Sequence, residues 1–176
     1  MAVSVSCSIK NGGKSKGQAN HDLSVRPAYA NEFFSPMNRV VFLDGDNQSD
    51  DLKDLIHHQS EDVKEFYNEN KTTRSRWQKS MKTHQVGLIS FGGDFFSIQD
   101  EVDKQKLDER AKEFFLGFCE KYHCRPSYLV RHEDETTTHY HFQIENLNRE
   151  KVKPLRFQKK DLQEIQDSVA QTFAPM

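Results

Sequence analysis

The amino-acid sequence predicts an α+β domain in which helices pack on a central antiparallel sheet. Segments with the alternating pattern of strands are interleaved along the chain with segments of helical periodicity. Two strand-like runs, 127–132 and 138–145, are separated only by a short polar loop, which favours an antiparallel hairpin. The 176 residues suffice for one sizeable core but are few for two linked domains, so a single domain over 1–176 is expected.

The remaining strands are expected in the first half of the chain. Residues 3–9 alternate apolar and small polar side chains and are followed by the break Asn11-Gly12-Gly13. Residues 40–43 form a short extended segment before a turn that begins at Asp44. Residues 86–91 have the apolar character of a buried strand and end at two glycines.

Apolar residues at helical spacing predict helices over 50–70, 104–122 and 161–173, the first being either one long helix or two joined ones. The second has the clearest apolar face and should cover a sheet. A polar segment, 14–24, could form a short helix that carries His21 and ends before Pro27. Together with the strands, these helices give the interleaved order on which the fold prediction depends.

Composition excludes several classes of protein. No apolar run is long enough to span a bilayer and the N-terminus lacks a signal-peptide pattern, so a cytoplasmic protein is expected. Cys7, Cys119 and Cys124 show no CxxC spacing, so reduced thiols are expected rather than a disulfide framework or a cysteine zinc site. With 25 Lys and Arg against 27 Asp and Glu, the net charge of -2 is not that of a generally basic nucleic-acid binder, and phosphate contacts would need a local basic surface.

The hairpin carries three histidines whose spacing indicates a metal site. Because side chains alternate along a strand, His139 and His141 point to one face while Tyr140 points to the other, toward the core. His132, at the end of the partner strand, can supply a third nitrogen, and three protein ligands leave coordination positions for water and substrate oxygens. Glu135 in the connecting loop could orient a ligand imidazole or accept a proton.

The run His132-Glu133-Asp134-Glu135-Thr136-Thr137-Thr138-His139-Tyr140-His141 resembles the H-x-D-E-x-T-P-H-x-H motif of the MobV (Mob/Pre) relaxases, which are HUH endonucleases. Thr138 stands where the family usually has proline, and no metal ligand is lost. The resemblance implies one divalent ion, Mn²⁺ or Mg²⁺, held by His132, His139 and His141, with Glu135 supporting the site. It also implies that 1–176 corresponds to an N-terminal nuclease domain, with homodimerisation through a C-terminal region.

The same resemblance indicates a nucleophile. MobV relaxases use a histidine in an N-terminal H-N-x-R motif, and the matching position is His21. Asp22 and Ser24 replace the motif's Asn and Arg, so the nearest arginine that could bind the scissile phosphate is Arg26. Tyr67 and Tyr29 are the alternative nucleophiles, although the helical apolar pattern around Tyr67 favours a place in the core.

A basic run after the first long helix could contact DNA. Its cations could bind phosphates while Trp77 stacks on a base, as in proteins that bind single strands. The alternative is a solvated basic surface with Trp77 tucked inward. Arg131, next to the metal motif, is a further candidate for a backbone contact. The candidate DNA-binding residues are Arg26, Arg74, Arg76, Trp77, Lys79 and Arg131.

The sequence thus predicts a site- and strand-specific nickase that cuts and rejoins single-stranded or hairpin DNA at a plasmid or mobile-element origin, through a covalent 5′-phosphoryl intermediate. Two alternatives stay open. One is a rolling-circle replication initiator or transposase of the same superfamily. The other is a non-catalytic DNA-binding autoregulator, which the changes around His21 and the slightly acidic balance allow.

Overall fold

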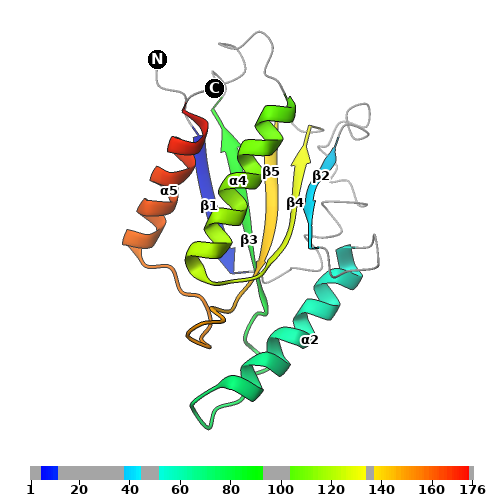
Figure 1. Ribbon diagram of the computed structural model, residues 1–176, viewed down its shortest axis with the longest axis vertical. Helices are drawn as coiled ribbons and strands as arrows, with labels where there is room; N and C mark the ends of the chain where they lie inside the picture. Colours follow the sequence, from blue (N-terminus) through cyan, green and yellow to red (C-terminus); the bar gives the residue numbers. More distant parts are fainter. Residues whose placement is uncertain (1–4, 12–37, 45–51, 93–103, 134–136, 175–176) are drawn as a thin grey trace.

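The computed structural model of the chain describes residues 5–11, 38–44, 52–92, 104–133 and 137–174 (Figure 1). The expected short helix at 14–24 and the loop after the glycines at 92 and 93 lie outside these residues.

Five strands form one sheet in the order β1-β3-β5-β4-β2, and every neighbouring pair is antiparallel. The strands are β1 (Val5–Asn11), β2 (Arg39–Leu43), β3 (His84–Phe91), β4 (Pro126–His132) and β5 (His139–Glu145). β4 and β5 are the predicted hairpin, with His132 opposite His139. The predicted α+β fold with a central antiparallel sheet is therefore confirmed.

Two strands extend beyond the segments that their apolar pattern marked. β3 begins at His84 instead of residue 86, because His84 pairs with Glu145 and Gln85 pairs with Ile144. β1 continues to Asn11, which pairs with Gln85. Both extensions consist of polar residues whose strand conformation comes from a partner strand, so the pattern of a single segment did not show them.

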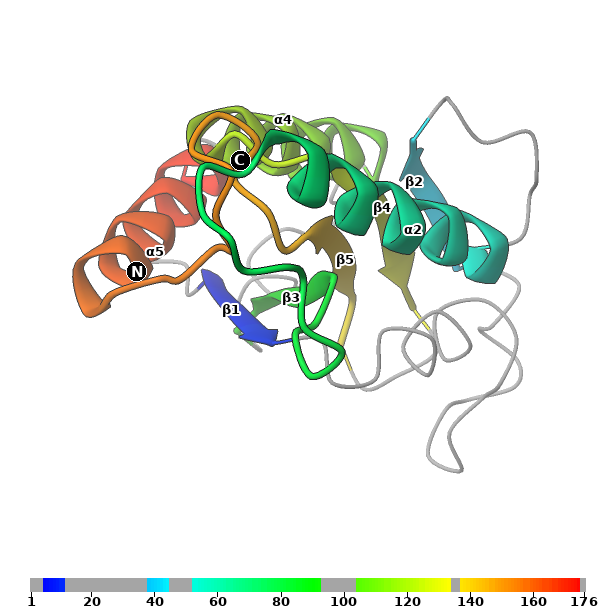
Figure 2. The ribbon, with the colours of Figure 1, turned by 90° about the horizontal axis from the view of Figure 1, so that it is seen from below.

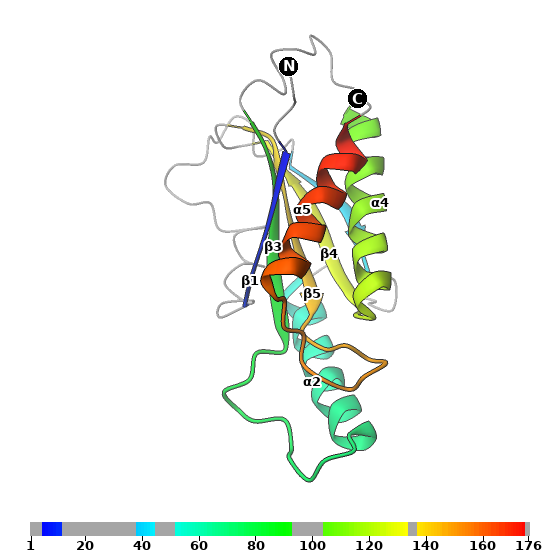
Figure 3. The ribbon, with the colours of Figure 1, turned by 90° about the vertical axis from the view of Figure 1, so that its left-hand side faces the viewer.

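The helices are α2 (Leu52–Asn70), α4 (Lys104–Tyr122) and α5 (Lys159–Phe173), which confirms the predicted long helices. α4 and α5 lie together over one face of the sheet (Figures 2 and 3). α5 begins before residue 161 because Gln158 and Asp161 form a capping box. The first turns of α2 pack elsewhere, with Leu55 and Ile56 against Tyr128 and Val130 of β4.

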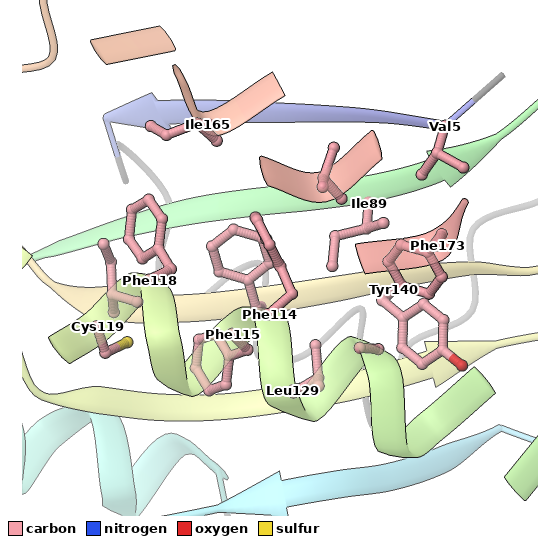
Figure 4. Close-up of a cluster of buried hydrophobic side chains, with 14 of the residues drawn as sticks. Val5, Ile89, Phe114, Phe115, Phe118, Cys119, Leu129, Tyr140, Ile165 and Phe173 are labelled. Carbon is pink, nitrogen blue, oxygen red and sulfur yellow. The ribbon is translucent and has the colours of Figure 1, made fainter. Parts of the chain in front are cut away.

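The main core lies between α4, α5 and the sheet (Figure 4). Phe115 and Phe118 of α4 pack against Phe142 of β5 with ring centroids 5.4 and 6.2 Å apart. The Phe142 ring also lies over Gly87 of β3, where an added Cβ would come within 2.0 Å of the ring. Six phenylalanines are buried in this core and supply much of it from few positions: Phe91, Phe114, Phe115, Phe118, Phe142 and Phe173.

All three cysteines are free thiols, as expected, with Cys119 and Cys124 buried. Burial raises the pKa of the Cys7 thiol to about 12, so this group stays protonated at neutral pH. Among the described helices, none combines the length and the apolar character that a membrane crossing needs.

Candidate metal centre

The three predicted histidine ligands lie on one face of the two central strands. Opposed residues of an antiparallel pair share a face, so the pairing of His132 with His139 puts both rings on the same side. His141, two residues along β5, points to that side too. Tyr140 points to the other face and is fully buried, which confirms the predicted alternation.

The spacing of the three rings fits one shared cation. The ring centroids are 5.4 Å apart for His132 and His139, 4.7 Å for His132 and His141, and 4.9 Å for His139 and His141. Imidazole nitrogens about 2.1 Å from one ion, at angles of about 90–110°, put the ring centroids about 4.5–5.2 Å apart. Two of the three separations therefore lie within the range that a common ion requires, and the 5.4 Å between His132 and His139 exceeds that range by about 0.2 Å.

A backbone contact fixes the tautomer of one of these rings. His139 Nδ1 lies 2.8 Å from the carbonyl oxygen of Thr137, and since a carbonyl oxygen only accepts, Nδ1 carries the proton. In the neutral ring, Nε2 then has the lone pair that could bind a metal, the arrangement that orients many metal-binding histidines.

The rings themselves are nearly parallel for two of the pairs, with interplanar angles of 18° and 28°. Within the described part of the chain, no group of three or more His, Cys, Asp and Glu side chains is already arranged to hold a metal ion. The observation that fits a metal is thus the presence of three imidazoles and their spacing. For one nitrogen of each ring to point at a shared ion, the rings would have to rotate.

A buried ionic network lies directly behind the histidines. Arg131 and Tyr140 oppose each other on the face away from the imidazoles, and both reach Asp108 of α4. Asp108 accepts hydrogen bonds from Arg131 Nη1 at 2.6 Å and from the Tyr140 hydroxyl at 2.9 Å. Burial, and then the negative charge of Asp108, raise the pKa of the Tyr140 phenol, which keeps it a donor at neutral pH. One carboxylate thus joins the two strands that carry the histidines.

Glu133 extends this network at the end of β4. Its carboxylate lies 3.1 Å from Arg131 Nε and accepts from Lys104 Nζ at 2.8 Å, while its backbone N–H donates to the Asn38 side chain at 2.7 Å. These contacts hold the residue that follows His132 against the start of α4. They should restrict the motion of the histidine-bearing strand end.

Comparison with known proteins assigns the family. The Mob_Pre family, described as "Plasmid recombination enzyme", matches residues 45–175. The chain belongs to this family. A "Plasmid recombination enzyme" of Lactiplantibacillus plantarum is 30% identical over 112 residues, which is 62% of this chain and 30% of that protein. The chain thus spans less than a third of this relative's length.

Solved structures share the Mob_Pre fold. A crystal structure of the MobM relaxase domain (MOBV; Mob_Pre), Mn-bound and in complex with 22 nucleotides of plasmid pMV158 oriT DNA, has a TM-score of 0.66 and 20% identity, and the match covers 99% of this chain and 88% of that one. A complex of the same domain with 23 nucleotides of this DNA has a TM-score of 0.63 and 22% identity, and the match covers 97% of this chain and 82% of that one. At these identities the likeness shows the fold.

The structure of this Mob_Pre chain corrects the expectation for Arg131. Its side chain is buried on the core face, where Asp108 and Glu133 hold the guanidinium, so it does not face a DNA backbone. The reason is the alternation of β4: only every second side chain shares the face of His132. Arg131 lies on the face of β4 opposite the three histidines.

Other predicted residues of this Mob_Pre domain lie at the opposite end of the sheet. Trp77 packs its ring edge-on against Tyr67 at 5.3 Å and donates from Nε1 to the Met81 carbonyl at 3.2 Å. This supports the inward alternative for Trp77 over base stacking. Tyr67 is buried in the same cluster and away from the histidines, which confirms the expected core position.

Of the predicted DNA-binding residues at that end, Arg74, Arg76 and Lys79 are exposed. Four predicted residues, His21, Arg26, Tyr29 and Glu135, lie outside the described residues.

Sequence reasoning missed Asp108. It lies one turn before Ala111 and two turns before Phe115, so it is a carboxylate on the apolar face of α4 and only 7% exposed. A charge at such a position needs a buried partner. An acidic residue on the otherwise apolar face of this helix is the signal in the sequence that could have pointed to a buried cation such as Arg131.

Proposed function

We propose that this Mob_Pre domain nicks one strand of plasmid or mobile-element origin DNA and later rejoins it, with a divalent metal at His132, His139 and His141. The observation that carries the proposal is the set of three imidazoles, 4.7–5.4 Å apart between centroids, on one face of the central hairpin. The Mn-bound, oriT-bound state of the related MobM domain supports the metal and the substrate class.

The chemistry is the transfer of a phosphoryl group from O3′ of one nucleotide to a histidine nitrogen. The lone pair of a His21 ring nitrogen forms a bond to the scissile phosphorus while the P–O3′ bond breaks, and the leaving O3′ takes up a proton. The product is a 5′-phosphoryl–histidine adduct with a free 3′-hydroxyl, and the reverse attack by that hydroxyl rejoins the strand. Glu135 would orient the attacking imidazole and balance its developing positive charge.

A divalent cation at the three histidines would polarise the non-bridging phosphate oxygens. The protein's own part is to hold the rings at their spacing. The Thr137 carbonyl fixes the tautomer of His139, and the Asp108 network holds the two strands from behind. By affinity alone, three imidazoles favour late first-row transition ions. Because metal availability also decides which ion is bound, Mn²⁺ and Mg²⁺ are the ions to test.

The test is incubation of the protein with Mn²⁺ or Mg²⁺ and end-labelled single-stranded oligonucleotides from candidate origins. We expect a specific nick and a protein–DNA adduct that survives denaturation. His21→Ala should abolish the adduct, whereas Tyr67→Phe and Tyr29→Phe should keep it. An adduct lost in a tyrosine variant would assign a different nucleophile.

The metal ligands are tested separately. His141→Ala should abolish Mn²⁺ binding in calorimetry, and the exposed His58→Ala is the matched control that should bind like wild type. Specific DNA binding without nicking or adduct on any origin, with either metal, would favour the non-catalytic autoregulator instead.

A further inference from the structure

β1 forms one edge of the sheet, so half of its backbone groups point away from β3. In an antiparallel pair, residues alternate between positions that bond to the neighbouring strand and positions that do not. The Cys7 N–H donates to the side-chain oxygen of Gln166 at 3.1 Å, so it points outward. By the same alternation, the backbone groups of Val5 and Ile9 also point outward, whereas those of Ser8 bond to β3.

The start of this edge is closed by a side chain of α5. The Gln166 amide accepts from the Cys7 N–H and donates to the Val5 carbonyl oxygen at 2.6 Å, which are the two bonds that a neighbouring strand would form there. Unpaired backbone groups at a sheet edge are a template for pairing with another chain. Gln166 thus removes that template along the first residues of β1.

The end of β1 has no such cover among the described residues. The Cys7 carbonyl and both backbone groups of Ile9 point outward, and no group in the described part of the chain bonds to them. Leu162 lies one helical turn before Gln166 and therefore on the same side of α5. Its side chain is 44% exposed and is one of two exposed large apolar side chains among the described residues. The edge therefore continues past Gln166 as an open strand with an exposed leucine beside it.

A groove of about 1000 Å³ adjoins this open part of the edge. Ile9 and Phe157, which pack against the main core, line the groove together with Leu162, so it opens on the face of the sheet that α4 and α5 cover. Lys82 and Arg156 supply its charge. Both are exposed, neither forms an ion pair with the described residues, and no carboxylate is among the described residues that line the groove.

A further cation lies on the other face of the same edge. Lys10 follows Ile9 along β1, so its side chain points to the opposite face, and it is exposed. It too forms no ion pair within the part of the chain that the structure describes. Side chains of an added strand would alternate between the two faces and would meet uncompensated cations on both. Such cations attract acidic groups.

We propose that the open part of the β1 edge, from Cys7 to Ile9, binds an acidic, extended peptide segment of a partner protein as an additional strand of the sheet. The outward backbone groups of Ile9 bond to the backbone of the peptide. Leu162 packs on its apolar side chains, and the three cations pair with its carboxylates. A nucleic acid could pair with the cations, but it has no row of alternating N–H and C=O groups to match the strand edge.

The probe is a fluorescently labelled, end-capped peptide of about six residues, the usual length of a strand, in which Glu and Val alternate. Three matched probes accompany it: the same peptide with every backbone nitrogen methylated, the same peptide with Lys in place of Glu, and a single-stranded oligonucleotide of equal charge. Affinity for the full chain is measured by fluorescence anisotropy. Hydrogen exchange of the backbone amides is followed by NMR.

We expect the Glu–Val peptide to bind at least about tenfold more tightly than the methylated peptide and the Lys–Val peptide, because each of these lacks one of the two kinds of contact. In the complex, exchange of the Ile9 amide should slow by at least about tenfold. The Ser8 amide is the internal control, because it already bonds to β3 and its exchange should not change.

One pair of variants tests the charges. Lys82→Glu/Arg156→Glu should bind the Lys–Val peptide in preference to the Glu–Val peptide, because the charge of the groove is reversed. The control, Lys64→Glu/Lys112→Glu, makes the same change of charge on α2 and α4 and should keep the preference of wild type. His141→Ala should bind the Glu–Val peptide like wild type, so this test does not depend on metal binding or nicking.

Three results would overturn the inference. The first is no binding of the Glu–Val peptide by wild type at about millimolar concentration. The second is equal affinity for the methylated peptide, which would indicate attraction between charges alone. The third is a lower dissociation constant for the oligonucleotide than for the Glu–Val peptide, with unchanged exchange of the Ile9 amide, which would assign the groove to nucleic acid.

Discussion

Histidine side chains have different surroundings at the two ends of the central strands. Where β4 ends and β5 begins, His132, His139 and His141 face one another, with His132 only 1% and His139 only 6% exposed. At the other end, His84 is fully buried, with Nδ1 3.1 Å from the Thr83 hydroxyl and Nε2 3.3 Å from the Gln59 carbonyl oxygen.

The difference between these ends shows that burial alone does not decide the role of a histidine. Both nitrogens of His84 are engaged by neutral groups of the chain, and burial lowers its pKa to about 3, so it serves as a neutral hydrogen-bonding residue. The other three histidines have one another's imidazoles as neighbours, which is the donor set proposed above for a metal. The groups that surround each ring therefore distinguish His84 from the proposed ligands.

The sharpest test of this comparison is one histidine substitution at each end. His141→Ala should lower Mn²⁺-dependent nicking by at least about a hundredfold, because loss of partners that only support ligands already costs about 10–100-fold. His84→Gln should nick at the wild-type rate at neutral pH. Nicking rates with the labelled origin oligonucleotide measure both. Similar losses in the two variants would break the distinction.

A second test removes the carboxylate behind the metal centre. Among the described residues, Asp108→Asn leaves the buried Arg131 with Glu133 as its one contacting carboxylate, so we expect a loss of about 3 kcal/mol in the free energy of unfolding. Urea denaturation measures it, and the exposed Asp167→Asn on α5 is the control. If the network also holds the histidine strands, Mn²⁺ affinity falls in Asp108→Asn but not in the control.

Buried His84, at the other end of the strands, predicts a specific dependence of the free energy of unfolding on pH. The His84 pKa is about 3 in the folded protein, below the ordinary value of 6.5, so the unfolded chain gains a proton first as the pH falls. The contribution of neutral His84 to stability is complete above about pH 6.5 and is lost progressively as the pH falls from about 6.5 to 3. The loss amounts to about 2 kcal/mol at pH 5. Unfolding curves at several pH values should show this slope in wild type and a smaller one in His84→Gln.

The smallest expected effect concerns Trp77, at the end of the sheet opposite the three histidines. Trp77→Leu removes the hydrogen bond to Met81 and part of a half-buried ring, so the protein should lose about 1–2 kcal/mol of stability. Its affinity for single-stranded DNA should stay within about twofold of wild type. A drop of about tenfold or more would indicate that the ring stacks on a base after all.

The sequence by itself determined most of the elements and the candidate ligand set. The alternation of His139, Tyr140 and His141, and the apolar face of 104–122, are local periodicities, and a strand or helix displays them whatever it packs against. The hairpin is local too, since only a short loop separates its strands. The fold class and the candidate metal ligands could therefore be predicted from the residues alone.

Only the tertiary structure decided the features that join distant segments. The sequence predicted that Arg131 contacts DNA, but in the fold α4 places Asp108 against it. The sequence also allowed Trp77 to stack on a base, but in the fold Trp77 packs edge-on against Tyr67. The physical reason is that a charged side chain acts on whatever lies within a few ångströms of it, and the chain path sets those neighbours.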